Sequence, residues 1–237
     1  MSYSYTDMIA AFKIGAAHPG GTNATKKAIS KMITYPHDSI LDVGCGIGKT
    51  LGYLATITNS KLYGVDAHPR MIKHARAHLD QFAQVMLFHS TIAALPIKDE
   101  SIDCILAESV TSFTNIHSSL KKYNQLLRPA GIACLIELTL EHELEDELHN
   151  EFCSFYGLNR LLSKDEWLTQ IKAADFAITE VISLKPESGE TLDIEIDNDI
   201  APAYFELMAY HYALIEQIRP SLSSYLFVCQ KKPRQPS

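Results

Sequence analysis

The sequence lacks the features that would indicate a membrane-spanning or nucleic-acid-binding protein. Its apolar runs are short, with residues 132–136 among the longest, and none approaches the length needed to cross a bilayer. Lysine and arginine number 21 against 28 aspartate and glutamate residues, for a formal net charge of −7. Affinity for nucleic acid or anionic membrane depends on clustered basic residues. We therefore expect neither as a partner.

Paired cysteines and an export signal are also missing. The five cysteines are odd in number and form no C-x-x-C pair, so we expect buried reduced thiols, without disulfides or a metal site. The first residues contain no basic stretch followed by an apolar one. These absences predict a soluble, cytoplasmic protein. With 237 residues of which 46% are hydrophobic, the chain can bury one sizeable core, which favours a single α/β domain.

The most informative segment is residues 39–50, SILDVGCGIGKT. Residues 40–43 are typical of a buried strand and lead into Gly44, Gly46 and Gly48, after which the sequence permits a helix. A turn without Cβ atoms lets the backbone approach a ligand, and the free N–H groups of the following helix favour electron-rich ligand atoms. The pattern predicts a strand, a ligand-binding turn and a helix.

Two common phosphate-binding motifs do not fit this turn. A P-loop needs a glycine five residues before Gly48, where Val43 stands. The dinucleotide fingerprint G-x-G-x-x-G needs its third glycine at position 49, which is Lys49. A sharp turn in any α/β protein remains the simplest alternative, so a ligand-binding role needs support from further motifs at set distances along the chain.

The run D-V-G-C-G-I-G from Asp42 resembles the first motif of the class I S-adenosylmethionine-dependent methyltransferases. The resemblance implies that the turn holds the methionine part of S-adenosylmethionine and that Asp42 orients the turn and the methionine ammonium group. The turn residues implied in binding are Gly44, Cys45, Gly46 and Gly48.

A second signal stands about twenty residues after the turn, at the end of the apolar segment 61–66, KLYGVD. A carboxylate such as Asp66 at a strand end can accept two hydrogen bonds from the ribose hydroxyls of an adenosine. Capping of a helix that starts at Pro69 is an alternative role, and the two roles can coexist. Ala67 and His68 come next, where the family usually places a residue that packs on the ribose and adenine.

Residues 89–99, HSTIAALPIKD, resemble the family's adenine-binding loop, which often reads G-D-A-x-x-L-P-F. Ser90 and Thr91 occupy the glycine and aspartate positions of that pattern. Because a hydroxyl replaces a carboxylate there, we expect Thr91, or the backbone of Ile92, to bind the adenine amino group more weakly.

Candidate catalytic groups lie on either side of the turn. In open α/β sheets ligands bind beyond the carboxyl ends of strands, so Glu108, Ser109 and Phe113, which come after the strand predicted at 102–107, should point toward the methyl group and its acceptor. A capping or ion-paired carboxylate is the alternative for Glu108. His18 comes after an expected aromatic helix within residues 1–13.

His18 either bonds its own backbone in the Pro-Gly-Gly turn or belongs to a lid over the glycine turn. If the acceptor is a phenol or an ammonium, Glu108 or His18 is the candidate general base, and histidine is better suited to proton transfer near neutral pH. An acceptor carbon would favour Glu108. The sequence leaves this choice open.

Strands alternate with helices along the chain, and the last strand lacks the usual short crossover. This resembles the Rossmann-like methyltransferase fold, which implies a mostly parallel seven-stranded sheet with helices on both faces and with the last strand inserted antiparallel between the fifth and sixth. We divide the single domain into an N-terminal helical lid (1–36), a cofactor-binding half (37–140), an acceptor-side half with the last strand (141–232) and a disordered tail (233–237).

Several local expectations accompany this fold. Thr22 should cap the second helix, and residues 152–162 should be irregular, with Phe155 and Tyr156 as possible pocket residues. Residues 202–218 should form a helix whose aromatic side chains pack against the sheet. Ala130 replaces a glycine of the family's L-x-P-G-G pattern, which a turn tolerates if its φ is negative.

These features predict a methyltransferase that uses S-adenosylmethionine, yields S-adenosylhomocysteine and acts on a small-molecule acceptor as a monomer or homodimer. The alternatives are a noncatalytic S-adenosylmethionine-binding or protein-interaction module on the same fold, and a nicotinamide-dependent oxidoreductase. Neither the acceptor nor the methylated atom is evident from the sequence.

Overall fold

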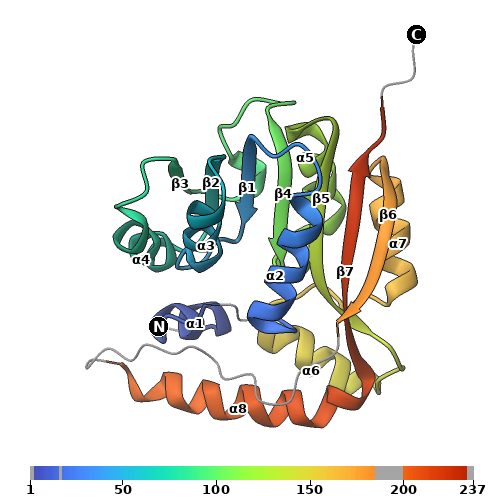
Figure 1. The fold of residues 1–237 in the computed structure, drawn as a ribbon. Coiled ribbons are helices and arrows are strands. Elements are labelled where there is room, and N and C mark those ends of the chain that lie inside the picture. The colour runs from blue at the N-terminus through green and yellow to red at the C-terminus, as the bar shows by residue number, and fades with distance from the viewer. Residues whose placement is uncertain (1–2, 16–17, 185–199, 234–237) are drawn as a thin grey trace.

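A computed structural model describes residues 3–15, 18–184 and 200–233 of the chain (Figure 1). Its centre is a seven-stranded sheet with the strand order β3-β2-β1-β4-β5-β7-β6. The strands are β1 (Ser39–Val43), β2 (Lys61–Asp66), β3 (Val85–His89), β4 (Ile102–Glu108), β5 (Leu127–Leu140), β6 (Phe176–Leu184) and β7 (Leu222–Lys231).

The sheet is parallel from β3 to β5, and β7 pairs antiparallel with both β5 and β6. All five residues of β1 are buried, as is typical of a parallel strand that is covered on both faces. The expected fold class, including the antiparallel last strand between the fifth and sixth, is confirmed. Strand order reverses between β1 and β4, and ligands bind at such a switch point in open α/β sheets.

Eight α-helices and three short 3-10 helices surround the sheet within the described residues. The α-helices are α1 (Tyr5–Ala11), α2 (Gly21–Met32), α3 (Lys49–Ile57), α4 (Pro69–Leu79), α5 (Ile116–Leu126), α6 (Asp146–Tyr156), α7 (Lys164–Ala173) and α8 (Pro202–Ile218). The 3-10 helices are η1 (Ile92–Ala94), η2 (Thr111–Phe113) and η3 (Arg219–Ser221). No helix of the described chain is both long and apolar enough to cross a membrane.

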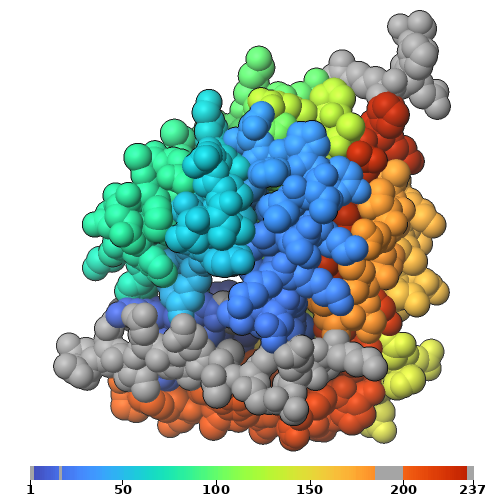
Figure 2. Space-filling view, in the orientation of Figure 1, coloured from blue at the N-terminus to red at the C-terminus, as the bar shows by residue number. Residues whose placement is uncertain are grey.

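The helices form three groups. Buried side chains of α5 and α7 pack with one face of the sheet, and those of α2, α3 and α4 pack with the other. Figure 2 shows side chains of α2 and α3 closed over this second face. Helices α1, α6 and α8 form apolar clusters of their own, and they lie beyond the strand ends toward which the β1 and β4 arrows point (Figure 1).

The structure corrects several local expectations. Helix α2 begins at Gly21 with Gly20 as its cap, and not at the predicted cap Thr22, because Gly20 adopts a left-handed conformation. Residues 152–156 belong to α6, which ends at Tyr156 before Gly157. The predicted disordered tail lies, from residue 234 onward, outside the described residues.

Two further expectations fail for reasons of backbone and packing. Ala130 has a φ of +65°, so a residue with a Cβ occupies a left-handed position that suits the glycine of the family pattern. Helix α8 has the expected bounds, but it packs mainly with α1 and α6 beyond the strand ends, and most of its aromatic side chains do not enter these clusters. Phe205, Tyr210 and Tyr212 are therefore exposed.

Candidate functional site

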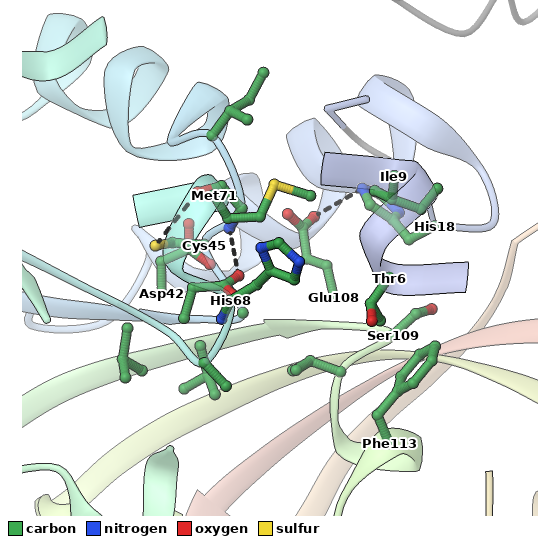
Figure 3. A pocket seen from close by; sticks show the side chains of 18 of the residues that line it. Thr6, Ile9, His18, Asp42, Cys45, His68, Met71, Glu108, Ser109 and Phe113 are labelled. Atoms are coloured by element: carbon green, nitrogen blue, oxygen red, sulfur yellow. Dashed lines mark hydrogen bonds and ion pairs between the residues drawn. The ribbon is translucent and has the colours of Figure 1, made fainter. Parts of the chain in front are cut away.

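A cavity of about 690 Å³ lies between the carboxyl ends of the central strands and helix α1. One wall comes from the turn after β1 and the ends of β2 and β4, and the opposite wall comes from α1, Ile14, Gly15 and His18 (Figure 3). Ligand pockets commonly have volumes of about 300–1,000 Å³. The cavity is large enough for a cofactor with a small second ligand.

The glycine turn (residues 44–48) contributes backbone to this cavity. Its position is fixed because Gly44 N and Cys45 N both donate to Val65 O, at 2.8 and 3.1 Å. A Cβ added at Gly46 would meet no atom within 4 Å, so the absent side chain leaves open space beside the backbone. A ligand can approach the chain closely there.

Gly48, also predicted to bind the cofactor, does not line the cavity. It caps α3 with a φ of +82°, and a Cβ there would lie 2.5 Å from Leu79 Cδ1. Its role in the structure is to let α3 start close to α4.

Asp66 ends β2 and lies beside the glycine turn. Its carboxylate accepts hydrogen bonds from Gly46 N at 3.0 Å and His68 N at 2.8 Å, one on each oxygen. A carboxylate offers about four lone-pair positions, so each oxygen can still accept from a ligand hydroxyl. Burial raises the pKa of Asp66. The cap of α4 is not Asp66 but His68, whose Nδ1 accepts from Arg70 N at 3.2 Å.

Asp42 is a buried carboxylate that lacks a complete set of partners. The residue is 2% exposed, and its Oδ2 has no hydrogen-bond partner. Burial, and then the nearby Glu108 and Asp66, raise the pKa of Asp42 well above its ordinary value. Because an unpaired buried carboxylate is costly, a cationic ligand group beside Asp42 would stabilise its charged form.

Glu108 and His18 lie in contact with each other at the edge of the cavity (Figure 3). His18 Nε2 lies 3.4 Å from Glu108 Oε1, and their side chains are 4% and 10% exposed. Thr50 Oγ1 donates to Glu108 Oε2 at 3.1 Å, whereas Oε1 has no hydrogen-bond partner. The structure therefore places His18 toward the cavity. Its Nδ1 also contacts Pro19 O at 3.3 Å, which is the backbone contact within the Pro-Gly-Gly turn that the sequence left open as the other alternative.

The segment after Glu108 is held by a second buried carboxylate, Glu137 on β5. Glu137 is fully buried and accepts from Thr111 N at 3.2 Å and Ser112 Oγ at 2.7 Å. Burial raises its pKa to about 7, although the two hydrogen bonds act in the opposite direction. At the start of the segment, Ser109 adopts a φ of +52°, a conformation that is uncommon for non-glycine residues and that clusters at functional sites.

Most residues that the sequence singled out gather at the cavity. Those that line it are His18, Asp42, Gly44, Cys45, Gly46, Asp66, Ala67, Thr91, Ile92 and Glu108. Burial raises the pKa of the Cys45 thiol, which disfavours the reactive thiolate. Within the described residues no group of side chains could hold a metal ion.

Other lining residues were not predicted from the sequence. They include Asp7 on α1 and Thr50 on α3, whereas His68, which the family resemblance did indicate, lines the cavity before α4. The run Ser4-x-x-Asp7 is a recognisable helix-start pattern, and Ser4 and Asp7 do form a capping box. No local signal indicates that Asp7 reaches His68, which is 61 residues away in the chain.

Three features of the site fit S-adenosylmethionine. The open space at Gly46 admits a ligand beside the backbone, the partnerless oxygen of buried Asp42 suits an ammonium group, and Asp66 keeps lone pairs for hydroxyls. Thr91 and Ile92 line the same cavity. Hydroxyl donors, an ammonium group and a planar ring are the parts that this cofactor presents.

Comparisons with known proteins agree with this interpretation. A family model described as "Methyltransferase domain" matches residues 40–131. The O-methyltransferase cnsE of Penicillium expansum is 24% identical over an alignment that covers 78% of this chain and 72% of cnsE. The crystal structure of geranyl diphosphate C-methyltransferase from Streptomyces coelicolor A3(2), in complex with S-adenosyl-L-homocysteine, superposes with a TM-score of 0.71 at 14% identity, over 89% of this chain and 76% of that one.

A relative of similar length decides the family. The uncharacterized methyltransferase YodH of Bacillus subtilis (strain 168) is 30% identical over 234 residues, which cover 96% of this chain and 99% of YodH. Together with the sheet order and the matching methyltransferase model, this likeness shows that the chain belongs to the class I S-adenosylmethionine-dependent methyltransferases.

Proposed function

We propose that the protein transfers a methyl group from S-adenosylmethionine to a small-molecule acceptor bound at the Glu108 end of the cavity. The observation that carries this proposal is the course of the cavity, which runs from the glycine turn past Glu108 and His18 to the residues of α1. A cavity covered by a helix suits a small acceptor better than a polymer chain. A small molecule, geranyl diphosphate, is also named as the substrate of one structural relative.

Four groups of the chain would hold the cofactor. The glycine turn would hold the methionine part, with the Asp42 carboxylate beside its ammonium group. Asp66 would accept from the ribose hydroxyls, and the segment Thr91–Ile92 would contact the adenine. When bound, the cofactor supplies a methyl group that its sulfonium already activates. The protein's task is therefore to align the acceptor and exclude water, a contribution that can reach roughly 7–11 kcal/mol.

Glu108 and His18 would take the acceptor's proton where the acceptor is a hydroxyl or an amine. Nδ1 of His18 lies 3.3 Å from the Pro19 carbonyl oxygen, and Nε2 lies 3.1 Å from Thr25 Oγ1 and 3.4 Å from Glu108 Oε1. In the tautomer that donates from Nδ1 to Pro19 O, Nε2 and Glu108 Oε1 are two neighbouring proton acceptors. A proton taken by either is stabilised by the other, as in a histidine–carboxylate pair.

Calorimetry with S-adenosylhomocysteine tests the cofactor part of this proposal. Asp66→Ala should weaken binding by about tenfold or more, because the carboxylate loses its bonds to two hydroxyls. Lys73→Ala, on the exposed face of α4, is the matched control and should bind like the wild type. Unchanged affinity in Asp66→Ala would contradict the assigned cofactor position.

Turnover tests the catalytic part. Cofactor labelled in its methyl group should pass label to a component of a metabolite extract, and Glu108→Gln with His18→Ala should abolish the transfer while cofactor binding persists. Cofactor binding without transfer to any component would favour the noncatalytic module instead. Binding of NADH in place of S-adenosylhomocysteine would favour the oxidoreductase.

A further inference from the structure

Two aromatic rings from distant segments stand parallel at the acceptor end of the cavity. Tyr5 on α1 and Phe113 on η2 both line the cavity, with ring planes 7° apart and centroids separated by 6.4 Å. Figure 3 shows Phe113 extending from the segment after Ser109 toward Thr6 on α1. This spacing is that of an aromatic pair, and the ring surface that the pair presents to the cavity can stack with a planar ligand.

The orientation of the Tyr5 ring is supported from behind. The ring packs edge-on against Tyr156, with centroids 4.6 Å apart, and the Tyr156 hydroxyl bonds His211 Nδ1 at 2.6 Å. Tyr156, which the sequence suggested as a pocket residue, thus acts on the cavity through Tyr5. Burial raises the pKa of the Tyr5 phenol, so this ring remains neutral at ordinary pH.

Phe113 is held through the backbone of its own short helix. Glu137 accepts from the two preceding residues, through Thr111 N and Ser112 Oγ. The Tyr5 ring and the backbone that carries Phe113 are therefore held before a ligand arrives, and such preorganisation lowers the entropic cost of binding.

The charges around the cavity disfavour an anionic acceptor at this end. The side chains from α1 and from the segment after β4 include Tyr5, Thr6, Ile9, Ser109, Val110 and Phe113, none of which is basic. The lysine and arginine among the described lining residues are Lys49, which begins α3 and whose side chain runs along Gly15, and Arg70, which begins α4 and whose side chain bonds Tyr204 on α8. A phosphate or carboxylate placed near Glu108 would be repelled by the Glu108 carboxylate.

The same end offers a place for one hydrogen-bond donor. Glu108 Oε1 is buried without a hydrogen-bond partner, and His18 Nε2 stands beside it. An O–H or N–H group on the acceptor could donate to this oxygen and satisfy it.

From these observations, and resting on the proposed function, we propose that the acceptor is a neutral planar aromatic molecule with a hydroxyl or amino group, stacked at Tyr5 and Phe113 with that group directed at Glu108. The rings select for planarity, the Glu108 carboxylate selects against anionic groups, and its Oε1 selects for a donor. Tyr5 and Phe113 are then specificity-determining residues of the site.

The test measures binding of 2-naphthol by calorimetry to the full chain saturated with S-adenosylhomocysteine. Tyr5→Leu and Phe113→Leu should each raise its dissociation constant by about tenfold, because a ring contact is lost together with buried area, while cofactor affinity stays unchanged. Phe205→Leu, at a half-exposed aromatic residue of α8 outside the cavity, should leave both affinities unchanged. Tyr5→Phe should recover the affinity lost in Tyr5→Leu.

Turnover with labelled cofactor completes the test and separates the two proposals. The proposed class predicts transfer to 2-naphthol, catechol or aniline and none to phosphoethanolamine or glycine. Transfer only to the charged aliphatic compounds would overturn the aromatic class and leave the methyltransferase assignment intact. Failure of the aromatic compounds to bind, or binding that neither leucine variant weakens, would also overturn it. Failure of S-adenosylhomocysteine to bind would instead remove the proposed function on which the inference rests.

Discussion

His68 Nε2 lies 3.1 Å from Asp7 Oδ1, and this contact joins helix α1 to the turn after Asp66. Because Nδ1 of His68 accepts from Arg70 N, the neutral ring carries its proton at Nε2 and donates it to Asp7. The pKa of Asp7 is lowered by its hydrogen bond with Ser4 and also by His68, so the carboxylate form is favoured. The wall of the cavity formed by α1 is thus linked to the turn that carries Asp66.

This link predicts faster cofactor release in Asp7→Ala. The lost hydrogen bond should raise the dissociation rate of S-adenosylhomocysteine by about two- to tenfold, as expected for a partly exposed contact. Stopped-flow displacement measures this rate. Ser4→Ala removes the cap of α1 but keeps the contact with His68, so it serves as the control. Equal rates in the two variants would show that helix capping alone is responsible.

Asp42 predicts a proton release when the cofactor binds. Its raised pKa means that the free protein holds the carboxyl group protonated up to a higher pH than usual. Pairing with an ammonium group favours the carboxylate, so binding releases a proton, and affinity falls as the pH falls below that raised pKa. Calorimetry in buffers of different ionisation enthalpy measures the released proton.

Asp42→Asn separates this effect from others. At a pH above the raised pKa of Asp42, the variant should lose the proton release and bind S-adenosylhomocysteine about 10- to 100-fold more weakly. It should also unfold at higher urea concentration because no buried charge remains. An unchanged proton count in Asp42→Asn would assign the release to another group.

Glu137 predicts a stability that decreases with pH. Its pKa is about 7 in the folded protein against an ordinary value of 4.5, so between these values the unfolded chain has lost a proton that the folded chain retains. The folded state binds more protons, and its contribution to stability is fully present below about pH 4.5 and is lost as pH rises through about 7. The loss amounts to about 3 kcal/mol at most.

Glu137→Gln isolates this contribution because it keeps the shape of the side chain without the charge. Urea unfolding at several pH values between about 5 and 8, a range that spans the folded-state pKa, should give a wild-type free energy of unfolding that declines relative to the variant. A constant difference between the two proteins over that range would contradict the prediction.

Ala130 predicts a stabilising substitution. Its φ of +65° is a left-handed conformation, which costs a residue with a Cβ roughly 1–2 kcal/mol. Ala130→Gly removes that cost, but the greater conformational freedom of glycine in the unfolded chain reduces the gain in stability by about 0.4–1 kcal/mol. We expect a net gain of about 0.5–1 kcal/mol in the free energy of unfolding. Ala77→Gly, at an exposed position inside α4, should instead lose about 1 kcal/mol.

Individual strands, turns and helix starts of this fold could be predicted from the sequence because each depends on neighbouring residues. The apolar run 40–43 before the alternating glycines specifies a strand and an open turn, and Ser163 with Glu166 specifies a helix start that the structure contains as a capping box. The position of the last strand came from the family resemblance, because periodicity does not reveal which strands pair.

The contacts that shape the cavity required the tertiary structure. Asp7 meets His68 across 61 residues, Ser112 meets Glu137 across 25, and Tyr5 lies parallel to Phe113 from a separate helix. Such meetings depend on strand register and on how helices pack over strand ends, which local periodicity does not encode. The sequence by itself determined the family, the cofactor and the glycine turn, whereas packing between distant segments decided which side chains face the acceptor.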